Sequence, residues 1–251
     1  MRRLSLLASQ ATGFDPLLTF LEDWPDGPIE VECWLVEAAP VNAQHIGQSL
    51  ISHWQVTAGG ELLSEDHAHR RLEQFTKGKR PYHLLADTPA ETLGLVGEFA
   101  DAILVSLADW LHVITPLWPQ PSPLFQAPIF CLANPRPPQV VVSAAQIGLV
   151  KQSLRFRVLR NLPWLLFSAE SNEGSVTKRV LGYVRTYTPR VSYVQLGNDC
   201  RERLPQLLPS QALWVVGPDF TLPCGSPIGD LVVHTLQIGS SFLILPSSKS
   251  A

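Results

Sequence analysis

Proline is concentrated in one stretch of this chain, and that stretch limits what the chain can fold into. Eight of the 22 prolines among its 251 residues lie within residues 116–138. Proline lacks the backbone N–H that a helix needs, and its ring clashes with the preceding turn, so no helix passes through this stretch. We therefore predict a domain boundary or a long extended crossover here. It divides the chain into an N-terminal domain (residues 1–116), a connector (residues 117–138) and a C-terminal domain (residues 139–251).

The composition is typical of a folded globular protein. With 45% hydrophobic and 16% charged residues, the chain is too apolar for a disordered class. Arg2 and Arg3 precede a short apolar run, but Ser5 and Gln10 interrupt it, so we expect no export signal. The most apolar later stretch, residues 99–117, carries charged residues, so we expect no membrane insertion.

The four cysteines are widely spaced and form no C-x-x-C pair. Counting alone leaves two disulfides open, but buried free thiols in a reducing compartment are the simpler interpretation. We therefore expect a cytoplasmic protein with these residues reduced: Cys33, Cys131, Cys200 and Cys224.

The N-terminal domain is expected to be an α/β region with one long helix. Residues 29–37 alternate apolar and polar side chains, which predicts a strand. Thr88-Pro89-Ala90-Glu91 is a capping box, with a hydroxyl at the N-cap, proline at N1 and a carboxylate at N3. Apolar residues then recur at spacings of three and four. This pattern predicts a helix of about 25 residues that ends at Pro116.

The C-terminal domain is expected to be rich in strands. Residues 154–158 alternate cleanly, with arginines between apolar side chains, and turn signals separate several further apolar runs. The fold class is therefore predicted as α+β, an α/β region followed by a β module. The other expected strands are residues 140–142, 164–167, 191–196, 212–216, 231–236 and 242–245.

Charge is distributed unevenly along the chain. Residues 1–150 contain 8 basic and 16 acidic residues, a net charge of −8, whereas residues 151–203 contain 10 basic and 4 acidic residues, a net charge of +6. Basic strands that also carry tyrosines could form a nucleic-acid surface with stacking and phosphate contacts. A solvated arginine-rich sheet face, or docking on the acidic half, explains the same pattern. The candidate residues within 151–193 are Arg155, Arg157, Arg160, Lys178, Arg179, Tyr183, Arg185 and Arg190, with Tyr187 and Tyr193 nearby.

Motifs for catalysis, metals or cofactors are missing. His67 and His69 form a His-x-His pair, but their surroundings look helical and no second ligand pair has a matching spacing, so a solvated charged face is the better interpretation. The chain has no G-x-S-x-G elbow, no phosphate-binding P-loop and no G-x-G-x-x-G fingerprint. We expect no cofactor and no enzymatic activity, although a histidine and a carboxylate that meet only in the fold would support a hydrolase.

One apolar unit near the C-terminus suggests a protein interface. A strand (residues 191–196), a leucine-bearing helical turn and a second strand (residues 212–216) follow one another closely. Such a unit is too small to bury its own apolar side chains, so it packs on the rest of the chain or on another copy. The candidate interface residues are Leu196, Leu204, Leu207, Leu208, Trp214 and Val216.

This unit resembles the start of a SpoA module, the small β unit of flagellar switch proteins and of the cytoplasmic ring protein of type III secretion systems. The matching segments are residues 191–196, Leu204, Leu207-Leu208-Pro209 and residues 213–216, and the module spans about residues 185–251. Ser210-Gln211 stands where the family has Gly-Asp, and a competing register places Ile228-Gly229-Asp230 at that corner.

The resemblance implies a non-enzymatic scaffold of the export sorting platform. SpoA modules pair as intertwined dimers, so the implied partners are a second copy or a related SpoA-like subunit, together with other export-platform proteins. The alternative hypothesis is an RNA-binding or RNA-processing subunit that uses the Arg/Tyr strands of residues 151–193. Steep salt dependence of RNA binding would favour the alternative, and self-association of residues 185–251 would favour the scaffold.

Overall fold

The computed structural model describes residues 2–8, 13–24, 29–37, 83–86, 89–107, 126–168, 174–195, 211–217 and 239–246. The elements before residue 135 are β1 (Arg2–Ala8), α1 (Phe14–Glu22), β2 (Ile29–Glu37), β3 (His83–Ala86), α4 (Pro89–Gly97), β4 (Ala102–Ser106) and β5 (Ile129–Leu132). The later elements are β6 (Val140–Ser143), α6 (Ile147–Ser153), α7 (Arg157–Arg160), β7 (Trp164–Ser168), α8 (Gly174–Arg185), β8 (Val191–Gln195), β9 (Leu213–Val216) and β10 (Ser241–Ile244).

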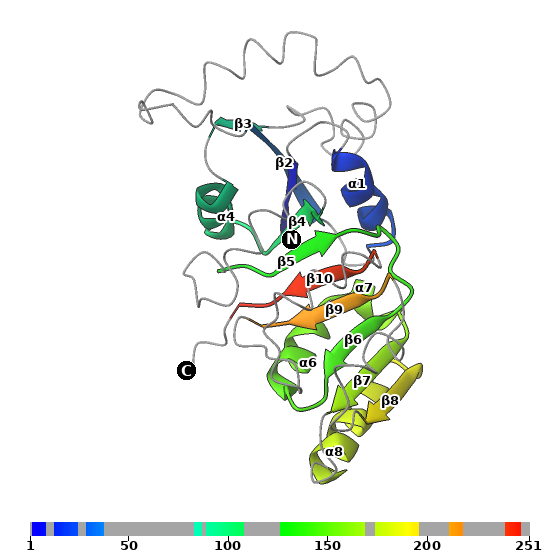
Figure 1. Cartoon of the computed structure of the whole chain (residues 1–251). Helices are drawn as coiled ribbons and strands as arrows, with labels where there is room; N and C mark the ends of the chain where they lie inside the picture. Colours follow the sequence, from blue (N-terminus) through cyan, green and yellow to red (C-terminus); the bar gives the residue numbers. More distant parts are fainter. Residues whose placement is uncertain are drawn as a thin grey trace.

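The described strands form one ten-stranded sheet that consists of two similar halves. The strand order is β3-β2-β1-β4-β5-β10-β9-β6-β7-β8 (Figure 1). The first half, β1 to β5, and the second half, β6 to β10, therefore repeat the same order. All pairs within each half are parallel, and the single antiparallel pair, β5 with β10, joins the halves.

The registers of the strands place a pseudo-twofold axis at the centre of the sheet. Leu6 of β1 and Val142 of β6 are equivalent positions on the same sheet face. Following the register from each of them through β4 and β9 leads to Phe130 in β5 and to Leu243 in β10. These two residues pair with each other, so the axis passes between them. The described strands therefore form a structural duplication, although the sequence contains no recognisable repeat.

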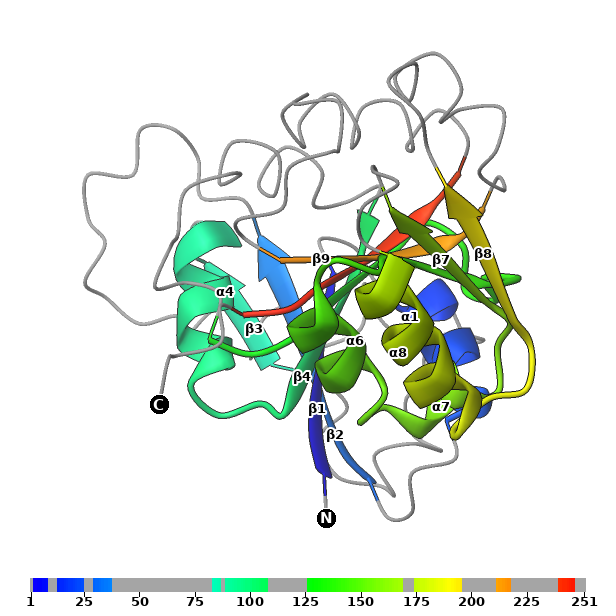
Figure 2. The same ribbon diagram turned by 90° about the horizontal axis from the view of Figure 1, so that it is seen from below.

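The sheet is covered on both faces, and six of its strands are buried along their whole length. All residues of β4, β5, β6, β7, β9 and β10 are buried. Parallel sheets require this, because their crossover connections lie on both sides. One apolar cluster contains side chains of α1, α6, α7 and α8, and the other contains side chains of α4. Figure 2 shows α1, α6, α7 and α8 gathered on one side of the sheet.

The long helix predicted from the capping box is wrong. A helix does begin at Pro89, but it ends at Gly97, and Ala102–Ser106 forms strand β4 instead. All five residues of β4 are buried. A strand buried on both faces is apolar at every position, so it also satisfies any helical spacing. The apolar spacing of the helix therefore continues into β4 without a visible break in the sequence.

The prediction of a strand at residues 154–158 is also wrong. Leu154 is the C-cap of α6, and Arg157 begins α7. The apolar residues of this segment are nevertheless buried in the cluster below the helices, since Leu154, Phe156 and Val158 are all at most 6% exposed. A turn between two short helices thus produced the same alternation as a strand. Strands were correctly predicted at β2, β6, β7, β8, β9 and β10; the one predicted at residues 231–236 lies outside the described residues.

The C-terminal domain belongs to a mixed α/β architecture rather than to a strand-rich β unit. It contains α6, α7 and α8 beside its strands. Strands β8 and β9, which the SpoA resemblance treats as one compact unit, are separated in the sheet by β6 and β7. The described strands therefore do not confirm a SpoA-like module. The predicted connector contributes β5, which joins the two halves.

Side chains from both halves pack together at this joint. Phe130 lies among Phe20, Trp24 and Phe156, at ring-centroid distances of 5.4, 5.7 and 5.1 Å. The buried Ser241 hydroxyl of β10 accepts hydrogen bonds from the backbone N–H groups just after β5. The halves are therefore held by a shared core as well as by the strand pair.

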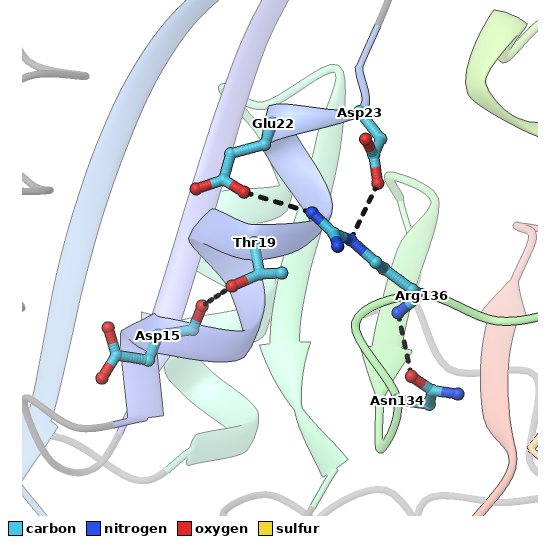
Figure 3. Close-up of polar contacts among 6 residues, drawn as sticks. All are labelled: Asp15, Thr19, Glu22, Asp23, Asn134 and Arg136. Atoms are coloured by element: carbon cyan, nitrogen blue, oxygen red, sulfur yellow. Dashed lines mark hydrogen bonds and ion pairs between the residues drawn. The ribbon is translucent and has the colours of Figure 1, made fainter.

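An ion pair on the surface connects the segment after β5 to the end of α1. Arg136 lies 3.5 Å from a Glu22 carboxylate oxygen and 3.2 Å from one of Asp23 (Figure 3). Its backbone N–H donates to the side-chain oxygen of Asn134 at 2.9 Å. The Arg136 side chain is 64% exposed, and pairs exposed to this degree contribute at most about 1 kcal/mol.

Candidate nucleic-acid interface

The helices on one side of the second half carry an excess of positive charge. The described parts of residues 147–195 contain eight basic residues and no Asp or Glu. Seven of the eight are exposed, and Arg160 is half-buried. They lie on or beside helices whose apolar residues share one core cluster. We call this set the basic face: Lys151, Arg155, Arg157, Arg160, Lys178, Arg179, Arg185 and Arg190.

Helix α8 positions three of these residues. Thr177, Val180 and Val184 are buried at spacings of three and four, which turns Lys178, Arg179 and Arg185 to the exposed side. Arg185 lies in the last turn, where a cation also interacts favourably with the helix dipole. The basic residues of 151–193 were predicted to lie on strands, whereas these three lie on a helix. The surface it forms is helical rather than a strand face.

The short helix α7 and its flanking turns position the arginines of the adjacent segment. Val158 and Leu159 are buried, and Arg157 is exposed. Arg160 Nε donates a hydrogen bond to the Leu154 carbonyl oxygen at 2.6 Å, which holds this side chain in place. The Arg190 guanidinium donates to the carbonyl oxygen of Asn161. Two of the basic side chains are therefore oriented by backbone acceptors.

Two tyrosines and one arginine form a cluster within this surface. Tyr183 and Tyr187 are one helical turn apart, with ring centroids 5.3 Å apart in an edge-to-face arrangement. The Tyr183 hydroxyl donates to the Tyr187 hydroxyl at 3.4 Å. The Arg160 guanidinium carbon lies 5.0 Å above the Tyr187 ring centroid, within cation–π range. We call Arg160, Tyr183 and Tyr187 the Tyr–Arg cluster.

Tyr183 is uncharged at neutral pH, and its surroundings oppose ionisation further. The hydrogen bond to Tyr187 is the main cause that raises the pKa of Tyr183 above its ordinary value, and Arg160 and Arg155 oppose this only in part. A neutral phenol does not repel an anion, and its hydroxyl remains a donor. The cluster therefore presents positive charge and aromatic rings without a compensating negative charge.

The structure brings together part of the predicted basic set. Arg155, Arg160 and Tyr183 lie close enough to interact electrostatically. Tyr193 serves a different role, because its hydroxyl pairs with the buried Ser168 at 2.6 Å. Sequence reasoning missed Lys151 as a member and the one-turn spacing of Tyr183 and Tyr187. That spacing signals a pair only on a helix.

The predicted partner interface is accounted for differently. Trp214 and Val216 are each 1% exposed within the single chain, in strand β9 between β10 and β6. Their burial therefore requires no second copy, because these two residues pack on the rest of the same chain. The remaining four residues lie outside the described part of the chain: Leu196, Leu204, Leu207 and Leu208.

Besides the basic face, one position at the edge of the sheet corresponds to the usual ligand site of open parallel sheets. In open parallel sheets, ligands bind at the carboxyl ends of the strands where the strand order reverses, which is between β6 and β9 in the second half. Leu149 of α6 fills the space beside Gly217 there, since a Cβ on Gly217 would lie 3.2 Å from a Leu149 methyl group. The loop from Ser143 to Gln146 has no glycine. These described residues do not form a phosphate-binding loop.

The described residues also assemble no metal or nucleophile site. Among them, no group of three or more His, Cys, Asp or Glu could hold a metal ion, and His67 and His69 lie outside the described part. Cys33 and Cys131 are free and buried, as predicted, and burial raises the pKa of both thiols. A buried neutral thiol is a poor nucleophile. None of the helices in the described ranges has the length and apolar character of a membrane span.

Comparisons with known proteins define the fold alone. No protein-family model and no curated protein significantly matches the chain. It is similar in structure to a universal stress protein from Archaeoglobus fulgidus, with a TM-score of 0.55 and 8% identity over 100% of this chain and 98% of the other. The cytoplasmic domain of a prokaryotic cation chloride cotransporter has a TM-score of 0.56 and 14% identity, over 99% and 97% of the two chains. Both likenesses extend over the whole duplicated sheet.

Proposed function

We propose that this protein binds nucleic acid, with RNA as the ligand, through the basic face. The observation that carries the proposal is the placement of eight basic residues, with no Asp or Glu, on the described helical layer of the second half. The chain as a whole has a net charge of −3 and a pI of about 6.2, so it would repel a polyanion on average. A local concentration of positive charge overcomes this repulsion at short range.

The chemistry of the side chains matches a phosphodiester backbone. Six of the eight residues are arginines, whose planar guanidinium groups donate two parallel hydrogen bonds to phosphate oxygens. Each phosphate that is neutralised releases condensed counterions, so the affinity falls steeply as salt rises. The basic face is an exposed helical surface, so backbone contact is expected to dominate over recognition of a particular base sequence.

The role is proposed to be binding rather than catalysis. The basic face contains no described carboxylate or histidine that could act as a general base. The scaffold role in a type III secretion platform remains a prediction. Of the residues that suggested it, Trp214 and Val216 are buried within the chain, and the leucines lie outside the described part. The structural observations therefore favour the nucleic-acid hypothesis.

The test is a fluorescence anisotropy titration of a labelled, unstructured single-stranded RNA. The key variant is Lys178→Ala/Arg179→Ala/Arg185→Ala, which removes three charges from the exposed side of α8 and retains good helix formers. We expect its affinity to be at least about a hundredfold lower at about 50 mM salt. Each phosphate contact contributes about 0.7 to the salt slope for single strands, so three lost contacts reduce the slope by about two.

The matched control is Arg3→Ala/Arg136→Ala, in which both arginines are exposed but belong to the first half and to the joint, and pair with carboxylates. This variant should bind RNA like the unmodified chain. The proposal is wrong if the unmodified chain retains no RNA even at about 50 mM salt, or if the α8 variant binds as tightly as the unmodified chain.

A further inference from the structure

We infer that the basic face selects single-stranded over double-stranded RNA, because the Tyr–Arg cluster offers a stacking surface for an unpaired base. This inference rests on the proposed function. The bases of a duplex are stacked on each other, whereas those of a single strand are free to stack on aromatic rings and guanidinium planes. A surface of basic residues alone would not distinguish the two.

The position of Tyr187 carries the inference. It is 40% exposed, although it is a large aromatic residue, and it lies in the turn directly after α8. Positive charge lies beside it, because Arg160 lies over the ring and Arg155 acts electrostatically on the adjacent Tyr183. A base that stacks on this ring would therefore have cations beside it for its own phosphate. The two interactions that single-strand binding requires coincide at one place.

The cluster is also pre-organised. Arg160 is anchored to the Leu154 carbonyl oxygen, and the Tyr187 backbone N–H donates to the Val184 carbonyl oxygen at 2.9 Å. The phenol groups of Tyr183 and Tyr187 contact each other. A ring that is already held in place loses less conformational freedom when a ligand binds. The exposed ring contributes to binding without first being ordered.

The decisive variant is Tyr187→Ala in the full chain, measured with three probes of equal length: a single-stranded RNA, an RNA duplex and an abasic single strand. We expect the variant to bind the base-containing single strand about tenfold more weakly, because stacking contributes on this scale per base. Its affinity for the duplex and for the abasic strand should not change, and neither should the salt slope. Tyr187→Trp should retain the preference.

The control is Phe99→Ala, which removes an exposed aromatic ring, 53% exposed, outside the basic face. It should leave all three affinities unchanged. If Tyr187→Ala leaves single-strand binding intact, or weakens duplex binding equally, the inference fails while the proposed function stands. If the unmodified chain binds none of the three probes, the proposed function itself fails.

Discussion

The two halves of this protein share one strand order and differ in the charge of the helices that cover the same side of the sheet. In the first half, α1 follows β1 and carries Asp15 and Glu22, with Asp23 directly after it. In the second half, the equivalent connection after β6 forms α6 and α7, which carry only basic charges. Both sets of helices bury apolar residues in one common cluster. The buried side specifies the architecture, and the exposed side is free to acquire a function.

The connection after the first strand of each half also differs in shape. Helix α1 is a single helix of nine residues, whereas the second half has two shorter helices with Leu154, Arg155 and Phe156 between them. This turn buries Phe156 in the aromatic cluster at the joint. It also places Arg160 within reach of Tyr187. The difference between the halves thus contributes both to the joint and to the candidate site.

The largest loss of stability is expected from Phe130→Ala, which removes an aromatic ring at the joint between the halves. Phe130 lies beside the pseudo-twofold axis, is fully buried and contacts aromatic rings from both halves. We expect a loss of about 3–5 kcal/mol in the free energy of unfolding, measured by urea denaturation with tryptophan fluorescence and far-UV circular dichroism. Phe99→Ala is the matched control and should change stability by less than about 1 kcal/mol. Two separate transitions in the unmodified chain would show instead that the halves unfold independently.

A smaller effect is expected from a substitution that stabilises the second half. Gly182 lies within α8, and a Cβ added there meets nothing within 4 Å. Gly182→Ala should raise the free energy of unfolding by about 0.5–1 kcal/mol, because alanine loses less backbone entropy on forming a helix.

The opposite effect is expected at Gly239, which has a φ of +70° that alanine rarely adopts. Gly239→Ala should therefore lower the free energy of unfolding by about 1 kcal/mol. Equal changes in the free energy of unfolding at Gly182 and Gly239 would contradict these two expectations.

The smallest effect is expected at the ion pair between the segment after β5 and the end of α1. Arg136→Ala removes the contacts to Glu22 and Asp23 (Figure 3). Because all three side chains are substantially exposed, we expect a loss of at most about 1 kcal/mol, and less at high salt. Urea denaturation at low and high salt measures it. A loss as large as that of Phe130→Ala would mean that this exposed pair contributes as much to stability as the buried core.

Much of the element pattern was predictable, but its assembly was not. The strands at β6, β7, β9 and β10 were predicted close to their bounds, because continuous apolar runs between turn residues indicate burial. The helix that extended through β4 and the strand at residues 154–158 were wrong for the same reason. Burial alone explains apolar residues at both spacings, and the type of element depends on what packs against it. Tyr187 was recognised as near the basic residues, but its approach to Arg160 depends on α7 and α8 lying together.

Which segments are buried and where charge is concentrated can be read from the sequence, because both properties belong to individual side chains and survive any rearrangement of the strands. The separation of β8 from β9, the pairing of β5 with β10 and the burial of Trp214 within the single chain depend on the tertiary structure. Strand pairing joins residues more than one hundred positions apart, such as Phe130 and Leu243. Any buried apolar strand can pair with several others, so the choice among them is made by the packing of the whole sheet.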